Sequence, residues 1–265
     1  MKIEGHSRKM RATLGTPIQY QLRLGEQQCV LNDFIGREVQ FTFAGQIHCI
    51  VCGRRTRKSF AQGFCYPCMQ SAPENSDCII RPELCRGHLG KGRDPEWERR
   101  HHVVEHVVYL AVSSAVKVGV TRAEQVPTRW IDQGASQARV LAYTPHRCAA
   151  GELEVALKAI FTDRTSWQKM LKNDVLESVD WDDVFDRIAE CLDDEYLDHL
   201  IDDAEVVDLH YPVEAYPEKV KSLSFDKTPV ITGTLQGIKG QYLLLDGHRV
   251  LNIRKHNGYH LTFEA

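Results

Sequence analysis

The sequence predicts an α+β protein, and three patterns carry that prediction. Apolar and polar residues alternate near both ends of the chain, between glycine-containing turns, as is typical of short antiparallel strands. Six of the nine cysteines lie between Cys49 and Cys85. Apolar residues recur at helical spacing in 153–161 and 184–201. We therefore expect five parts: an N-terminal β module (1–47), a ribbon-like cysteine segment (48–97), a small mixed α/β domain (98–178), acidic helices (179–214) and a C-terminal antiparallel β module (215–265).

The terminal modules are short, so we expect them to support each other. "EVQFTFAGQIHC" reads as a strand that runs into the first cysteine. The segment 219–265 alternates, with turns at Gly237, Gly240, Asp246-Gly247 and Asn257-Gly258. Small β pieces of this size seldom stand alone, which predicts that the two ends of the chain pack together.

Charge is distributed unevenly along the chain. Residues 1–150 carry 21 Lys and Arg against 13 Asp and Glu, and residues 151–265 carry 12 against 23. A basic half favours a polyanionic partner, and the overall charge of −3 argues against a non-specific nucleic-acid coat. The acidic stretch 180–208 is either a solvated helix face or a phosphate mimic that covers a basic surface.

No long apolar run or signal peptide is visible, so we expect a cytoplasmic protein without membrane contact. The oligomeric state is left open.

Four cysteines have the spacing of a structural zinc site. Cys49-x2-Cys52 is followed by twelve residues and then by Cys65-x2-Cys68. Zinc prefers four such ligands in a tetrahedron, and each Cys-x2-Cys turn can supply two thiolates to one ion. The alternative is redox-active or coincidental thiols. Four basic residues lie between the two pairs and could contact phosphate: Arg54, Arg55, Arg57 and Lys58.

A second group of metal-binding residue types follows. Cys85-x2-His88 has ligand spacing, and Cys78 could supply a third ligand. The fourth would come from elsewhere, with His101 or His102 as candidates. The alternative is a pair of buried thiols beside a surface histidine.

The segment after these cysteines resembles the GIY-YIG nuclease superfamily. The residues that carry the resemblance are "VVY", "KVG", "VTR", "RW" and "ELEVALKAIF", within 103–172. The whole pattern, with its four-cysteine segment, is similar to an uncharacterised family of bacterial and archaeal zinc-containing proteins. Lys117 stands where the superfamily's second motif usually has a tyrosine, and Val107 stands at the first motif's glycine.

The resemblance implies a phosphodiesterase site. Tyr109 would be the strand tyrosine that acts with water as general base, and Gly119 the glycine of the second motif. Arg129 or Arg122 would stabilise charge on phosphate, and Glu154 would hold Mg²⁺ or Mn²⁺, with Glu152 nearby. Lys117 could lower the pKa of the phenol.

The leading functional prediction is therefore a metal-dependent endonuclease-like phosphodiesterase acting on DNA or RNA. It requires Tyr109, Arg129 and Glu154 to meet in an open cleft. The alternatives are a zinc-containing nucleic-acid-binding or adaptor protein that does not cleave, and a structural zinc protein without a nucleic-acid role. Trp130 could stack on a base and Gln133 could hydrogen-bond to one, but Trp130 suits a protein core equally well.

Overall fold

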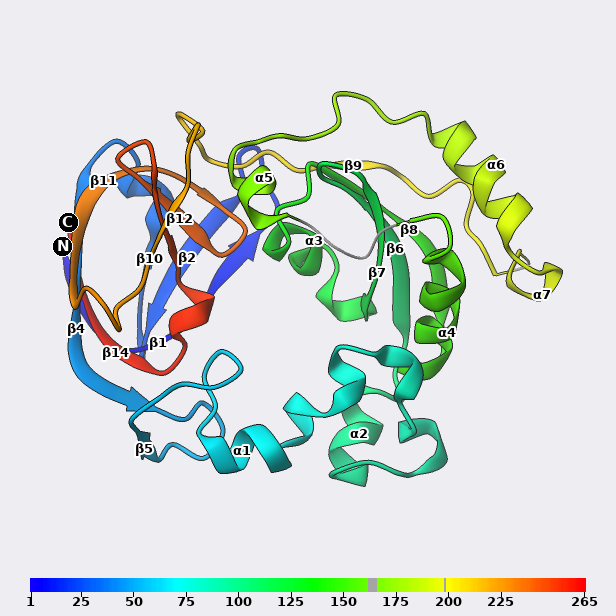
Figure 1. Cartoon of the computed structure of the whole chain (residues 1–265), viewed down its shortest axis with the longest axis horizontal. Coiled ribbons are helices and arrows are strands. Elements are labelled where there is room, and N and C mark those ends of the chain that lie inside the picture. The colour runs from blue at the N-terminus through cyan, green and yellow to red at the C-terminus, as the bar shows by residue number, and fades with distance from the viewer. Residues whose placement is uncertain (162–165, 198) are drawn as a thin grey trace.

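The structure is a computed structural model that describes residues 1–161, 166–197 and 199–265 (Figure 1). The predicted α+β class is confirmed: the two largest features are β-sheets, and short helices lie beside one of them. The predicted domain 98–178 and acidic stretch 180–208 each include residues outside the described ranges. No helix in the described part of the chain is long and apolar enough to cross a membrane.

The two ends of the chain form one sheet of ten strands. Its order is β10-β13-β12-β11-β4-β14-β1-β2-β3, with β5 paired to β4. The modules expected at 1–47 and 215–265 are thus halves of one structure, because β4 pairs with both β11 and β14, and β1 pairs with β14. The termini lie together in Figure 1. The strands are β1 (Lys2–Thr13), β2 (Gln19–Leu24), β3 (Gln27–Val30), β4 (Glu38–His48), β5 (Arg55–Thr56), β10 (Lys221–Leu223), β11 (Val230–Lys239), β12 (Tyr242–Leu245), β13 (Arg249–Asn252) and β14 (Tyr259–Glu264).

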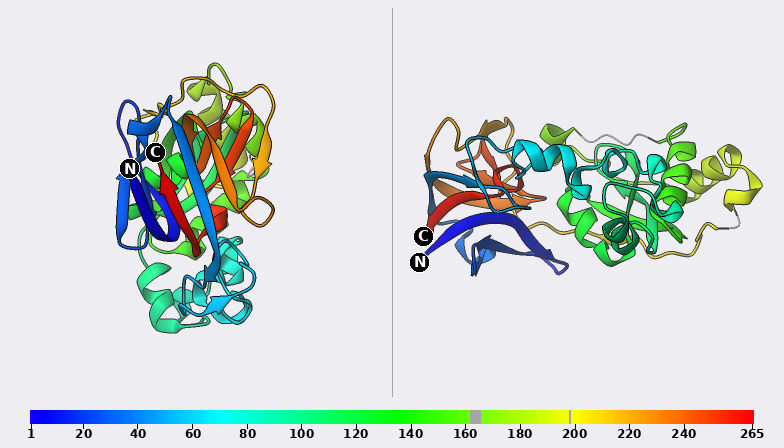
Figure 2. Two further views of the ribbon diagram at one scale, coloured as in Figure 1. Left: turned by 90° about the vertical axis from the view of Figure 1, so that its left-hand side faces the viewer. Right: turned by 90° about the horizontal axis from the view of Figure 1, so that it is seen from below.

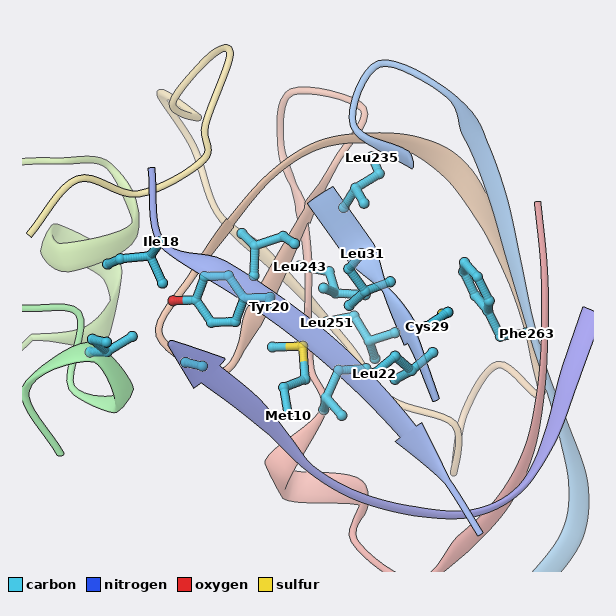
Figure 3. Close-up of a cluster of buried hydrophobic side chains, with 14 of the residues drawn as sticks. Met10, Ile18, Tyr20, Leu22, Cys29, Leu31, Leu235, Leu243, Leu251 and Phe263 are labelled. Carbon is cyan, nitrogen blue, oxygen red and sulfur yellow. The ribbon is translucent and has the colours of Figure 1, made fainter. Parts of the chain in front are cut away.

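Alternation along these strands builds the main core. Successive side chains of a strand point to opposite faces, and in β2 the residues Tyr20, Leu22 and Leu24 are all buried. Side chains from β1, β2, β3, β12, β13 and β14 converge in Figure 3, including Met10 and Phe263. The curved sheet therefore encloses its own apolar core.

The cysteine segment connects this sheet to the rest of the chain (Figures 1 and 2). It contains α1 (Tyr66–Ser71), the 3-10 turns η2 to η5 between Pro73 and Leu89, and α2 (Pro95–His101). Asp94 caps α2 by accepting hydrogen bonds from the backbone of Glu96 and Trp97, and Pro95 occupies the first turn of the helix.

A smaller four-stranded sheet follows, in the order β7-β6-β8-β9. β6 and β7 form an antiparallel hairpin, with Tyr109 of β6 directly opposite Gly119 of β7. The elements are β6 (His106–Val112), β7 (Val116–Arg122), α3 (Thr128–Asp132), β8 (Gln137–Thr144), α4 (Arg147–Leu157) and β9 (Val207–Asp208). Every residue of β6 is buried, because its two faces belong to two different cores.

The acidic stretch contains the expected amphipathic helix. Its elements are α6 (Trp181–Cys191) and α7 (Asp194–Leu197), and α5 (Trp167–Leu171) precedes them. Val184 and Ile188 of α6 are buried in the same core as Leu153 and Leu157 of α4. α6 therefore covers the outer side of the smaller sheet, as Figure 1 shows.

Candidate metal centres and the Tyr109 cluster

The first candidate metal centre is the group of Cys49, Cys52, Cys65 and Cys68. Their four sulfur atoms lie within 4.8 Å of one another, so one ion could contact all four. Cys49 follows β4, and Cys65 is the residue before α1. Gly53 has a φ of +70°, which closes the turn after Cys52, and its amide donates to the Cys49 carbonyl at 3.0 Å. The local backbone thus brings together two pairs of thiols that are far apart in the sequence.

The surroundings of Cys49 favour a thiolate. Burial opposes ionisation of its thiol, but the amides of Cys52, Cys65 and Val51 donate to the sulfur and lower its pKa to about 6. A thiolate is the form that binds metal. This group can therefore bind a metal ion.

The four basic residues between these cysteine pairs lie on the surface and form what we call the basic strip: Arg54, Arg55, Arg57 and Lys58. Backbone pairing of β5 with β4, His48 opposite Arg55, holds the strip against the large sheet. Lys58 Nζ lies 5.3 Å from the centre of the Phe60 ring. Within the described residues, none of the four forms an ion pair with a carboxylate. Their charge is therefore exposed to solvent.

The second candidate metal centre consists of Cys78, Cys85, Glu98 and His102, whose ligand atoms also lie within 4.8 Å of one another. His102 Nδ1 lies 3.8 Å from Cys78 Sγ and 3.6 Å from Cys85 Sγ. His102 Nδ1 is also in direct contact with the Glu98 carboxylate. All four residues are buried. The sequence indicated the two cysteines and offered His102 as one of two candidates.

His88, which was expected to join Cys78 and Cys85, lies outside this group of four. His88 is exposed, and its ring stacks on His146 with ring centres 4.4 Å apart. His101, the other candidate, turns away and stacks on Trp97, with centres 4.1 Å apart. The residue of this group that the sequence did not indicate is Glu98. Its spacing of four from His102 puts both on one face of α2, which is the signal that could have identified it.

A cavity of about 640 Å³ lies beside the second centre. Cys78, Cys85 and Glu98 contribute to its wall, together with Cys148 and basic residues such as Arg86. A smaller cavity of about 190 Å³ touches His102 on another side and includes Arg122 and Arg147. The second centre is thus buried but borders open space.

The residues expected to form the phosphodiesterase site gather around Tyr109. Burial raises the pKa of its phenol, while the positive charge of Arg129 lowers it in part. The charge of Glu154 also acts on Tyr109. A methyl group added to Gly119 would lie 2.5 Å from the Tyr109 hydroxyl, so the ring lies directly over this glycine. Arg129 and Glu154 therefore lie close enough to Tyr109 for their charges to act on its phenol.

Tyr109 itself has no exposed surface: its exposed fraction is 0%. Its side of β6 belongs to the same core as Trp130 and the large sheet, and the ring centres of Tyr109 and Trp130 are 6.1 Å apart. In the part of the chain that the structure describes, Tyr109 therefore does not line the expected open cleft. Trp130 is buried with it, so the expected stacking of Trp130 on a nucleotide base does not fit this arrangement.

The other residues expected in the phosphodiesterase site differ in their burial and in their charged partners. Burial, and then the charge of Arg129, lower the pKa of Lys117 to about 8. Glu154 is 8% exposed, and its carboxylate pairs with Lys158 at 3.3 Å. Arg122 pairs with Glu124 at 2.9 Å and borders the smaller cavity. Arg129, and not Arg122, is therefore the arginine that acts on Tyr109.

Comparisons with known proteins give a family and nothing further. A search of curated proteins and a search of solved structures each found no match. The model of one family, described as "Protein of unknown function (DUF2797)", matches residues 36–261. That range covers far more than half of the chain and spans both candidate metal centres and the Tyr109 cluster, and the chain therefore belongs to the DUF2797 family.

Proposed function

We propose that this protein binds nucleic acid through the basic strip and does not cleave it. The observation that carries this proposal is the strip itself: four exposed cations, without carboxylate partners among the described residues, on the loop of a candidate metal centre. Phosphate backbones are recognised by such exposed Lys and Arg, because each contact releases counterions from the polyanion.

Zinc is the metal that suits the Cys49 group. Its four ligands are soft thiolates, which select Zn²⁺ over hard cations such as Mg²⁺. A zinc ion there would fix both ends of the loop that carries the strip. The four guanidinium and ammonium groups would then meet phosphates without first losing the conformational freedom of a loose loop.

The choice of binding over hydrolysis rests on Tyr109. A general base must come within hydrogen-bond reach of the water it activates. The Tyr109 side chain is fully buried, and burial raises its pKa, which disfavours the phenolate. Both properties oppose the role that the GIY-YIG resemblance implies.

Hydrolysis of the GIY-YIG type is the second candidate function, and one observation favours it. Tyr109, Arg129 and Glu154 interact electrostatically although they come from a strand and two different helices. In this alternative, Glu154 would hold Mg²⁺ or Mn²⁺ and Arg129 would stabilise the phosphate. Nucleic acid would have to displace the residues that cover Tyr109.

Binding is tested by fluorescence anisotropy with labelled single- and double-stranded DNA and RNA of mixed sequence. The test variant replaces Arg54, Arg55, Arg57 and Lys58 by Gln. The matched control replaces four exposed basic residues elsewhere by Gln: Arg23, Lys219, Lys221 and Lys227. We expect the test variant to lose most of its affinity and the control to bind like the wild type. Equal binding by all three proteins would reject the strip as the binding surface.

Cleavage is tested on the same nucleic acids with Mg²⁺ and with Mn²⁺. We expect no products from the wild type. Cleavage that disappears in both Tyr109→Phe and Glu154→Ala, with binding retained, would favour the second candidate instead. Binding and cleavage are measured separately, so a failure of one proposal is not read as a failure of the other.

A further inference from the structure

We propose that Cys78, Cys85, Glu98 and His102 bind a second zinc ion, and that this ion holds α4 against the cysteine segment. The inference does not depend on nucleic-acid binding. It rests on four observations: the charge buried at this site, the groups that surround the four ligands, the contacts between the site and α4, and the adjacent cavity.

The burial of this group favours a cation at its centre. None of the four residues is more than 7% exposed, yet the group combines two thiols and a carboxylate. Buried anions are strongly destabilising unless a positive charge compensates them. His102 contributes at most one positive charge, and it lies close to all three acidic groups. A divalent cation would compensate two of the three negative charges that two thiolates and the Glu98 carboxylate carry, with the imidazole neutral and acting as a ligand.

Zinc fits this set of ligands. Thiolate, imidazole and carboxylate are all ordinary zinc ligands, and four of them complete a tetrahedron. Mg²⁺ and Ca²⁺ prefer oxygen ligands only, and the two thiols exclude an all-oxygen site.

The groups around the ligands orient them as partners of metal ligands do. The amide of Gly87 donates to Cys85 Sγ at 3.5 Å, and Ser76 Oγ lies 3.2 Å from Cys78 Sγ. A methyl group on Gly92 would lie 2.4 Å from Cγ of Glu98, so only a glycine leaves room for the glutamate to turn toward the sulfurs. The site is therefore shaped around its carboxylate.

The segment that carries Cys78, Cys85 and His102 is also in contact with α4. The amide of Arg147 donates to the His102 carbonyl at 2.8 Å. Its guanidinium donates to the carbonyls of Cys78 and Ile79 at 2.8 and 3.0 Å. A methyl group on Gly151 would lie 2.2 Å from the Glu83 amide nitrogen, so the helix and the loop are in direct contact. An ion that fixes Cys78, Cys85 and His102 would thereby fix the start of α4.

The cavity of about 640 Å³ gives the ion a route to the site, because Cys78, Cys85 and Glu98 all border it. The metal can therefore load into the folded protein without passing through the core.

The test measures zinc per chain by mass spectrometry of the purified full-length protein, and amide hydrogen exchange across 147–157. The test variant is His102→Ala, and the matched control is His88→Ala, a neighbouring histidine outside the group. We expect two zinc ions in the wild type and in the control. In His102→Ala we expect one, together with faster exchange in α4. One zinc in the wild type, or two in His102→Ala, would overturn the proposal.

His102→Cys keeps a metal ligand at this position and covers the case in which His102→Ala does not fold. Loaded with Co²⁺, the wild type should show visible absorption from both centres. The His102→Cys protein should show stronger thiolate-to-cobalt absorption, because a third sulfur joins the second centre. A spectrum identical to that of the wild type would show that residue 102 is not a ligand, and would overturn the proposal.

Discussion

Lys239 should make the stability of the protein depend on pH in the alkaline range. This residue ends β11, is 1% exposed, and donates from Nζ to Asn173 Oδ1 at 2.8 Å. Its ammonium lies 5.2 Å from the ring centre of Tyr211 and 5.1 Å from that of Tyr216. No carboxylate among the described residues pairs with it. Burial lowers its pKa from 10.5 to about 8.

The size and sign of the effect follow from these two pKa values. Below pH 8, the lysine is protonated in both the folded and the unfolded states, so its contribution is constant. Between pH 8 and 10.5 the unfolded state binds more protons, so the free energy of unfolding rises with pH. The total rise is about 3 kcal/mol, at 1.36 kcal/mol for each pH unit between the two pKa values.

The assay is urea unfolding of the wild type and of Lys239→Met at pH values from about 7 to about 10.5. Other titrating groups contribute equally to both proteins, so the difference between them isolates Lys239. We expect the wild type to gain stability relative to Lys239→Met as pH rises, by about 3 kcal/mol in all. Lys219→Met, at an exposed lysine, should run parallel to the wild type. Parallel curves for all three proteins would refute the reasoning.

Three further predictions concern stability. Gly119→Ala should lower the free energy of unfolding by about 1–3 kcal/mol, because its methyl group would overlap the Tyr109 hydroxyl; urea unfolding that matches the wild type would contradict that contact. Burial lowers the pKa of His106 from 6.5 to about 4. The unfolded state therefore binds more protons than the folded state between pH 4 and 6.5, and the free energy of unfolding should fall on acidification through that window. His106→Gln should lose less stability than the wild type on acidification through this window. Thermal melts in which the two proteins show the same dependence on pH would contradict this prediction. Chelation of the proposed zinc should lower the melting temperature, because a metal that binds only the folded state stabilises it. Scanning calorimetry with and without chelator checks this, and an unchanged midpoint would contradict it.

The individual strands of the ten-stranded sheet could be predicted from the sequence, but the pairing between them could be predicted only in part. Alternation along β4 and β11 indicated strands, because one face of each is buried. Their pairing joins Val39 to Gly233, residues almost two hundred positions apart, and local periodicity carries no information about such contacts. Only the general need of small β pieces for a partner indicated that the ends meet.

Some features of the candidate sites could also be predicted from the sequence, and others depend on the fold. The Cys49 group was predictable, because two Cys-x2-Cys pairs are a local signal. Glu98 was not identified, since a glutamate on a helix is usually a surface residue and only the fold brings it to Cys78 and Cys85. The burial of Tyr109 could not be predicted from its strand either, because α3 and the large sheet share the core that encloses it.

The most direct test of the proposed function is the salt dependence of nucleic-acid binding by the wild type and by the variant with Gln at residues 54, 55, 57 and 58. Each phosphate contact by a cation contributes about 0.7 to 0.9 to the slope of log affinity against log salt concentration. Loss of all four cations should make the slope shallower by about 3. An unchanged slope would show that the strip does not contact phosphate and would contradict the account.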